Sequence, residues 1–171
     1  LGEEVWEALD ITARTTVADA ERIFRDHRDD PGFDFSSVVT RIPKAIEIQC
    51  NAIMRRAAAK LPAATPMANV EGRSRHLSRG HGLTLGQLAR VVSGEKERFE
   101  ALARGHTNGA WFTSQLPQIL EELRVLRNPA SHSSRVDRED ATRWRNRILG
   151  VGGSVMTVPL LRRAGLPMGQ A

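Results

Sequence analysis

Apolar residues recur at helical spacing along most of this chain of 171 residues, and this pattern constrains the fold more than any other feature. In two long segments they fall every three to four residues, as they do on one face of an α-helix. The first segment covers residues 3–28 and the second covers residues 36–60. Asp29-Asp30-Pro31-Gly32 lies between them and indicates a turn. No segment shows a convincing strand pattern or an internal repeat, so we expect an all-α fold.

Start and stop signals divide the rest of the chain into shorter helices. Thr84 is a suitable N-cap for a short helix, and further helical residues run from about 95 to 104. Thr113 or Ser114 is a suitable cap for a helix over 114–127, and Asp137 with Asp140 opens another that ends near Leu149. Residues 62–83 are rich in Pro, Ala, Gly, Ser and Arg and predict a long loop. Pro43 predicts either a kink in the second helix or its true start.

These elements predict a helical bundle of about five to six helices with a long loop over 62–83. The length suits a single helical domain over residues 1–150, followed by a C-terminal tail over 151–171 that packs on the bundle or trails from it. Because the chain begins with Leu, it is compatible with a piece of a larger protein.

Composition limits the class of protein. Hydrophobic residues make up 40% and charged residues 26% of the chain, as in ordinary globular proteins. No apolar run reaches the length of a membrane span, so we expect no membrane association and a cytoplasmic protein. Cys50 is the only cysteine, which excludes an internal disulfide, and we expect it in the core. The net charge of +5 permits a nucleic-acid partner without requiring one.

The helix over 114–127 carries a charged residue on its apolar face. Its stripe is formed by Leu116, Ile119, Leu120, Leu123 and Leu126. Arg127 falls near the middle of this stripe, where a guanidinium needs a partner because it cannot lose its charge. Either Arg127 pairs with an internal carboxylate, such as Glu47 or Asp10, or the stripe opens there into a cleft that receives an anion. We interpret Glu47, near the edge of its own apolar face, as a solvated helix charge.

Asn128, Pro129 and His132 follow this arginine directly. A residue before proline avoids the helical region, so we expect the helix to break or kink at Asn128. A new turn beginning at 128 would place His132 in the first turn of that segment, where free N–H groups favour a phosphate. A continuous, kinked helix fits the same residues.

These residue types supply the chemistry for cutting RNA without a metal. The arginine is a fixed cation for a phosphate, the asparagine orients a polar partner, and the histidine moves protons. Ser131, Arg135 and Arg138 are candidates for binding the substrate phosphate, although loop polarity also explains Ser131. The basic segment 73–82 could follow an RNA backbone, and solvated disorder explains it nearly as well. His76 and His81, with no cysteine or carboxylate cluster, predict no metal site.

The block Arg127-Asn128-Pro129-Ala130-Ser131-His132, between an amphipathic helix and a second helix over 137–149, resembles the signature of HEPN domains. These domains occur in prokaryotic toxins, CRISPR-associated ribonucleases and anti-phage effectors. The resemblance covers roughly residues 114–149. It implies a helical bundle that dimerises and acts as a metal-independent endoribonuclease. Arg127 and His132 would be catalytic, and Asn128 would support them.

The resemblance also sets expectations for partners and regulation. We expect an endoribonuclease that acts as a toxin or as an anti-phage or stress effector, with RNA and a second copy of the chain as partners and no cofactor or metal. An antitoxin or another defence protein would be a further partner. Some HEPN domains carry a modifiable tyrosine two residues after the histidine, whereas this chain has Ser134 there and no tyrosine. The alternative is a non-catalytic module for dimerisation or for binding a partner or nucleotide within a larger defence assembly.

Overall fold

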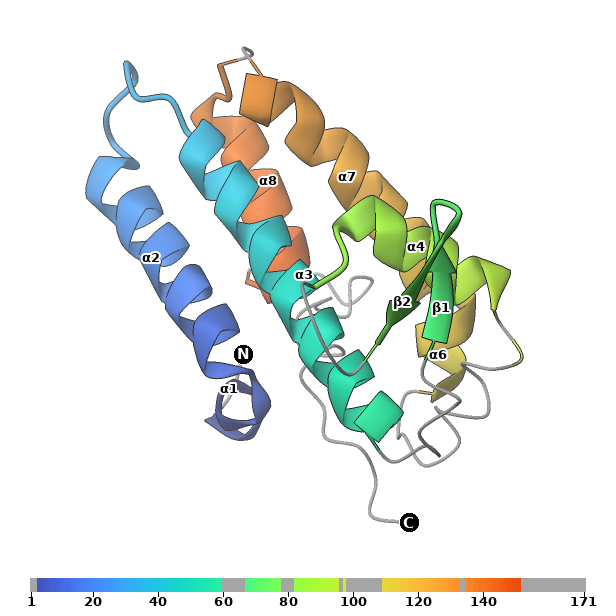
Figure 1. Ribbon diagram of the computed structural model, residues 1–171. Helices are drawn as coiled ribbons and strands as arrows, with labels where there is room; N and C mark the ends of the chain where they lie inside the picture. Colours follow the sequence, from blue (N-terminus) through green and yellow to red (C-terminus); the bar gives the residue numbers. More distant parts are fainter. Residues whose placement is uncertain are drawn as a thin grey trace. The chain divides into compact units, whose positions relative to one another are not determined.

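The computed structural model describes residues 3–59, 67–77, 82–95, 97, 109–132 and 135–151 (Figure 1). The fold is mostly helical, with one small two-stranded hairpin among the described residues. The predicted helical class is therefore confirmed, whereas the HEPN-like bundle stays a prediction. Across the described ranges, no helix combines the length and apolar character needed to cross a membrane.

The chain divides into two compact units. The first comprises Leu1–Gln49 and Val125–Leu166, and the second comprises Cys50–Arg124 and Pro167–Ala171. Two long helices, α3 (Ser36–Ala59) and α7 (Leu116–His132), contribute residues to both units. The prediction of a single domain over 1–150 stays a prediction.

In the first unit, α1 (Glu3–Ala8) and α2 (Ile11–His27) precede the beginning of α3, and the end of α7 leads to α8 (Arg138–Leu149). Figure 1 shows α3 beside α2 and α8. The Asp10 N–H donates to Gln49 Oε1 over 2.7 Å, and Arg145 binds Glu21 on α2. The buried apolar residues in the described part of this unit are Val5, Leu9, Ala13, Val17, Ala20, Phe35, Val38, Val39, Ile42, Ala45, Ile46, Ala141, Ile148 and Leu149.

The expected first helix over 3–28 is in fact two helices, so that prediction was wrong. Asp10 lies between α1 and α2, and its Oδ1 accepts the Thr12 N–H over 2.9 Å as an N-cap. Val5 and Leu9 are buried in the same way as the apolar residues of α2. Apolar periodicity therefore continues across the break and could not reveal it.

The second predicted helix, over 36–60, is confirmed as α3. Pro43 lies inside this helix, so it does not mark the start. Cys50 is fully buried, as expected for a small core residue.

The second unit contains a hairpin that was expected to be loop. Strands β1 (Met67–Val70) and β2 (Arg73–His76) pair in antiparallel register, with Val70 opposite Arg73. Glu71 and Gly72 both have positive φ, as a two-residue type I′ turn requires, and Asn69 Oδ1 accepts the Gly72 N–H. Each strand has only four residues, and β2 is wholly polar in sequence. The alternation that predicts a strand is therefore too short to detect.

Helices α4 (Leu85–Gly94) and α6 (Gly109–Ser114) and the beginning of α7 complete the described part of this unit. The predicted cap Thr84 is confirmed, because it forms a capping box with Gln87. Thr113 and Ser114 do not cap the motif helix, since both belong to α6. The buried apolar residues of this unit include Cys50, Ile53, Met54, Ala58, Ala68, Val70, Leu77, Leu83, Leu85, Leu88, Ala89, Val91, Val92, Trp111, Leu116, Leu120 and Leu123.

Helix α8 begins and ends as expected. Asp137 Oδ1 accepts the Asp140 N–H over 2.8 Å at its start, and Gly150 ends it in the left-handed conformation at φ 69°. Most of the expected helix over 95–104 and the tail over 152–171 lie outside the described residues.

Candidate active site on helix α7

Helix α7 carries the Arg-Asn-Pro-Ala-Ser-His block without interruption to its last residue, His132. The expected break at Asn128 does not occur, so the alternative of a continuous helix holds. Pro129 cannot donate to the carbonyl of Val125, and Val125 is 56% exposed, so water is available at this part of the helix. His132 therefore lies at the C-terminal end of α7, where the predicted phosphate-binding N–H groups of a new helix start are absent.

The uninterrupted helix fixes the relative positions of the motif residues. Positions 128 and 132 are one turn apart on the same face, because four residues span slightly more than a turn. Positions 127 and 132 are separated by about 140° around the axis, since each residue advances about 100°. One helix therefore presents the arginine position and the histidine position on different faces.

Arg127 is held by a buried carboxylate from α3. Its Nη1 donates to Glu47 Oε2 over 3.2 Å, and both residues belong to the first unit. The Glu47 side chain is 6% exposed, whereas that of Arg127 is 24% exposed. Of the two roles considered for Arg127, pairing with an internal carboxylate is confirmed, with Glu47 as the partner rather than Asp10.

Glu47 was wrongly interpreted as a solvated charge. It lies one turn before Cys50 and two turns before Met54, both of which are buried, so the sequence did contain a signal for burial. Lys44 Nζ donates to the other Glu47 oxygen, and the Lys44 side chain is 51% exposed. One carboxylate thus faces two cations, and this Lys44-Glu47-Arg127 cluster keeps one net positive charge beside α7.

The other motif residues are described to different extents. Asn128 is half-buried and has a contact of its own. The side chains of Ser131 and His132 lie outside the described part of the chain. Their roles in binding substrate and moving protons therefore stay predictions.

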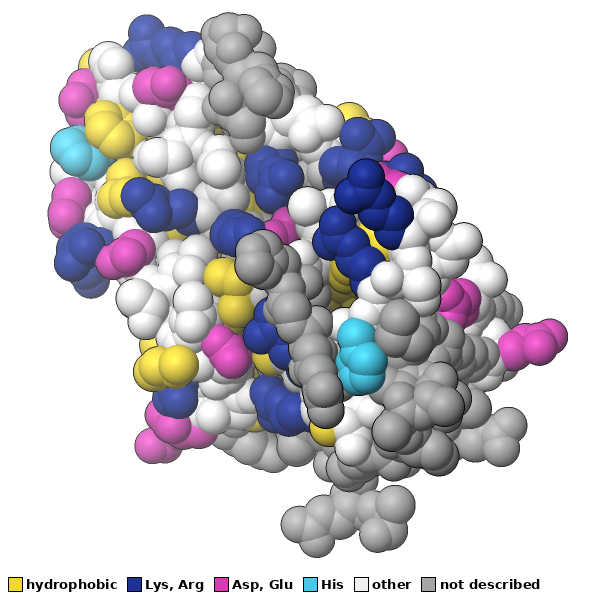
Figure 2. Space-filling view, viewed as in Figure 1, with side chains coloured by type: hydrophobic (Ala, Val, Ile, Leu, Met, Phe, Trp, Pro, Cys, Tyr) yellow, Lys and Arg dark blue, Asp and Glu magenta, His cyan; other side chains and the backbone are white. Residues whose placement is uncertain are grey.

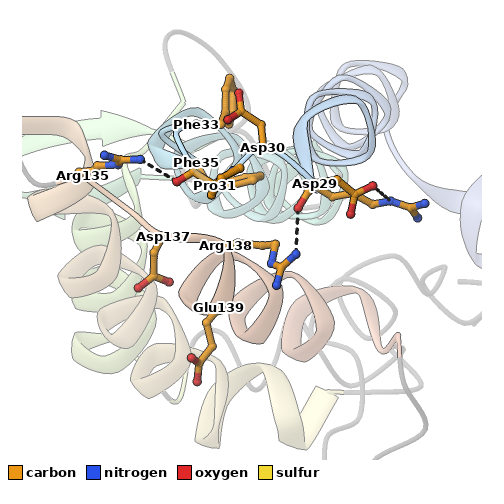
Figure 3. Close-up of a pocket in the computed structure, with 10 residues that line it drawn as sticks. Asp29, Asp30, Pro31, Phe33, Phe35, Arg135, Asp137, Arg138 and Glu139 are labelled. Carbon is orange, nitrogen blue, oxygen red and sulfur yellow. Dashed lines mark hydrogen bonds and ion pairs between the residues drawn. The ribbon is translucent and has the colours of Figure 1, made fainter.

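Arg135 and Arg138, the two predicted substrate-binding arginines, line a pocket of about 630 Å³ in the first unit (Figure 3). Arg135 Nη2 donates to the Pro31 carbonyl over 3.1 Å, and Arg138 Nη1 donates to the Arg28 carbonyl over 3.3 Å. A guanidinium has five N–H groups, so each side chain retains donors for a ligand. The pocket is lined by Arg28, Asp29, Asp30, Pro31, Phe33, Phe35, Arg135, Asp137, Arg138 and Glu139. With three arginines and four carboxylates, its lining is not basic.

Asp34 joins the two segments that form this pocket. Its Oδ1 accepts the Ser36 N–H and the Val136 N–H, each over 3.0 Å, and the Ser36 hydroxyl. Phe35 N–H in turn donates to the Val136 carbonyl over 3.0 Å. The Ser36 side chain and then the backbone N–H groups hold the pKa of the Asp34 carboxyl below its ordinary value. The charged carboxylate therefore stabilises the link between the 28–35 segment and the start of α8.

Asp34→Ala should lower the free energy of unfolding by about 1 kcal/mol near neutral pH, because three hydrogen bonds to a carboxylate are lost in an exposed setting. A lowered pKa in the folded state stabilises the protein above the ordinary aspartate pKa of about 3.9, and this contribution is lost as the pH falls below it. Urea unfolding of both proteins should therefore show a difference at about pH 7 that shrinks at about pH 3. Asp29→Ala, which removes the exposed partner of Arg28, is the control and should show a smaller difference. A pH-independent loss for Asp34→Ala would contradict the role of its charge.

Comparisons with known proteins add no relative. No protein-family model, no curated protein sequence and no solved structure matches the chain. Within the described residues, no group of three or more His, Cys, Asp or Glu side chains is arranged to hold a metal ion. The expectation that no metal or cofactor is needed stays a prediction.

Proposed function

We propose that this chain is a metal-independent endoribonuclease of the HEPN type that acts on single-stranded or structured RNA as a homodimer. The observation that carries this proposal is the position of Arg127. A buried carboxylate fixes this arginine, a quarter of its side chain remains exposed, and His132 follows five residues later at the end of the same helix. A fixed, partly exposed cation and a titratable group are the minimum required for charge stabilisation and proton transfer at a phosphate, and one helix carries both.

The reaction uses the RNA's own 2′-hydroxyl as nucleophile. One group removes the proton from this hydroxyl, and another donates a proton to the departing 5′-oxygen. We assign proton transfer to His132, stabilisation of the negative charge on the phosphorane to Arg127, and orientation of the substrate or the imidazole to Asn128. Ser131, Arg135 and Arg138 bind neighbouring phosphates, and no metal or cofactor takes part.

The dimer supplies what one chain lacks. The motif contains a single histidine, whereas the reaction requires two proton transfers. The arginine and histidine positions also lie on different faces of α7. A single phosphate bound to one face of this helix would therefore not meet both residues of the same chain. A two-fold dimer brings two histidines and two arginines together in one cleft.

The resemblance to HEPN domains also supports the proposed cellular role. We propose a cytoplasmic toxin or an anti-phage or stress effector, controlled by an antitoxin or by another protein of a defence system. Ser134 stands where some HEPN domains carry a modifiable tyrosine, so we do not propose control through that modification.

The ion pair of Arg127 favours a second candidate function. If Arg127 serves only to neutralise Glu47, the chain is a non-catalytic module for dimerisation or for binding a partner or a nucleotide. This candidate predicts that purified protein leaves RNA intact and that substitutions at Arg127 change stability or binding alone.

Incubation of the purified protein with mixed single-stranded RNA in excess EDTA tests the proposed function. We expect the protein to cleave RNA in EDTA, and added Mg²⁺ should not increase the rate. The protein should also have the mass of a dimer in solution. Arg127→Ala should lose cleavage, whereas Arg124→Ala, which removes an arginine one turn earlier on α7, should retain it. Intact RNA in EDTA with cleavage only after Mg²⁺ is added would contradict the proposal, as would a strictly monomeric active enzyme.

A further inference from the structure

Strand β2 presents two arginines at the surface of the second unit. Arg73 is exposed and Arg75 is half-buried, and they lie opposite Val70 and Ala68 in the register of the hairpin. Ala68 and Val70 are 2% and 3% exposed, and β1 contacts α4. The hairpin is therefore anchored through β1. Cross-strand partners share one face, so Arg73 and Arg75 extend from the same face as these buried residues and reach past them to the surface.

Among the described residues, no carboxylate neutralises the charge of these two arginines. Arg90 on α4 binds Glu71, and Arg124 binds both oxygens of Glu121, which lowers the pKa of that carboxyl. In the part of the chain that the structure describes, neither Arg73 nor Arg75 forms an ion pair with a carboxylate. The guanidinium groups of Arg73 and Arg75 can therefore bind an anion from outside the chain.

The spacing of Arg73 and Arg75 suits a polyanion with regular charges. Residues two apart on a strand lie on the same face and are separated by about 6.6 Å, because each residue rises about 3.3 Å. This distance is close to that between successive phosphates of one nucleic-acid strand. Figure 2 shows Lys and Arg side chains gathered over the hairpin and α4 on the visible face.

We propose that Arg73 and Arg75 on strand β2 bind the phosphate backbone of RNA, as a binding surface separate from the motif on α7. Contacts to phosphate carry no sequence information, so this surface raises affinity without selecting a sequence. The choice of RNA over another polyanion rests on the proposed function. The hairpin holds both guanidinium groups on a fixed backbone, so less conformational freedom is lost on binding than with a disordered basic segment.

Binding of a labelled single-stranded RNA to protein carrying His132→Ala, which keeps the RNA intact, tests this inference. Adding Arg73→Gln and Arg75→Gln should weaken binding about tenfold at moderate salt. The slope of log affinity against log salt should fall by about 1.4, since each single-strand phosphate contact contributes about 0.7. Arg55→Gln with Arg56→Gln, two exposed arginines on α3, is the control with the same change of net charge and should alter binding much less. Arg73→Lys with Arg75→Lys should retain most of the affinity.

The outcomes separate this surface from the nuclease. If the hairpin and control variants lose RNA affinity equally, the loss is explained by net charge alone and the inference is overturned. Unchanged RNA binding by the hairpin variant would also overturn it while leaving cleavage by the motif intact. Binding that depends on Arg73 and Arg75 in a wild-type protein that never cuts RNA would support the surface and refute the nuclease. Arginine-dependent binding to phosphatidylserine vesicles without RNA binding would overturn the inference in favour of a membrane partner.

Discussion

His132→Ala should lower the rate of RNA cleavage in EDTA by about a thousandfold, because general acid–base catalysis by one side chain contributes roughly 10²- to 10⁴-fold. In the proposed dimer both copies of the imidazole disappear, so neither proton transfer keeps its group. RNA binding should change little, since Arg127 and the other arginines, which this substitution leaves in place, supply the fixed positive charge for the phosphates. The measurement is the initial cleavage rate at saturating RNA for the wild-type and variant proteins.

His27→Ala is the matched control for this experiment. It removes an imidazole from α2 that stacks on Phe33, with ring centroids 3.9 Å apart. We expect a modest loss of stability and a cleavage rate within a few-fold of wild type. If His132→Ala retains the wild-type rate, His132 is not catalytic. A loss of similar size in His27→Ala would indicate that the assay reports folding rather than chemistry.

Glu47→Ala should lower the free energy of unfolding by about 2 kcal/mol and should also abolish most of the cleavage. Removing one partner of a buried ion pair typically costs about 3–5 kcal/mol, and the 24% exposure of Arg127 reduces this cost. Lys44 and Arg127 would then face each other without the carboxylate between them. Cleavage falls because Arg127 loses the contact that fixes its guanidinium near the RNA phosphate. Urea unfolding and the cleavage assay measure the two effects separately.

A paired substitution distinguishes the structural role of this ion pair from its role in the reaction. Replacing both partners of a buried ion pair with apolar residues is often neutral or stabilising. Glu47→Leu combined with Arg127→Met should therefore recover most of the stability lost in Glu47→Ala. It should not recover cleavage, because no cation remains to stabilise the phosphorane. A stable double variant that cleaves RNA at the wild-type rate would assign Arg127 to folding alone.

Helical periodicity and capping residues correctly predicted the long amphipathic helix α3 and the starts of two other helices. Helix α3 follows the apolar spacing of residues 36–60 closely, and the Asp137 and Thr84 caps locate the starts of α8 and α4. The same periodicity concealed the break at Asp10, because Leu9 continues the apolar pattern while the cap itself is polar. The hairpin was missed because its four-residue strands have too few apolar positions to show alternation.

The candidate site was predicted in part. The stripe on α7 predicted either a carboxylate partner for Arg127 or a cleft that receives an anion, since a guanidinium on an apolar face keeps its charge. The structure shows the carboxylate partner. The stripe could not select Glu47 with certainty, because the pairing joins residues 80 positions apart in sequence. The dipeptide Asn128-Pro129 suggested a helix break from local preference, yet α7 continues to His132. Packing of the whole helix overrides a single unfavourable residue.

Attack by the RNA's own 2′-hydroxyl, supported by Arg127 and His132, leaves characteristic groups at the ends of the fragments. End-group analysis of the fragments formed in EDTA measures these groups. We expect a 2′,3′-cyclic phosphate on one fragment and a 5′-hydroxyl on the other, with neither product formed by His132→Ala. Fragments bearing a 5′-phosphate and a 3′-hydroxyl, or RNA that stays intact with the wild-type protein, would contradict this mechanism.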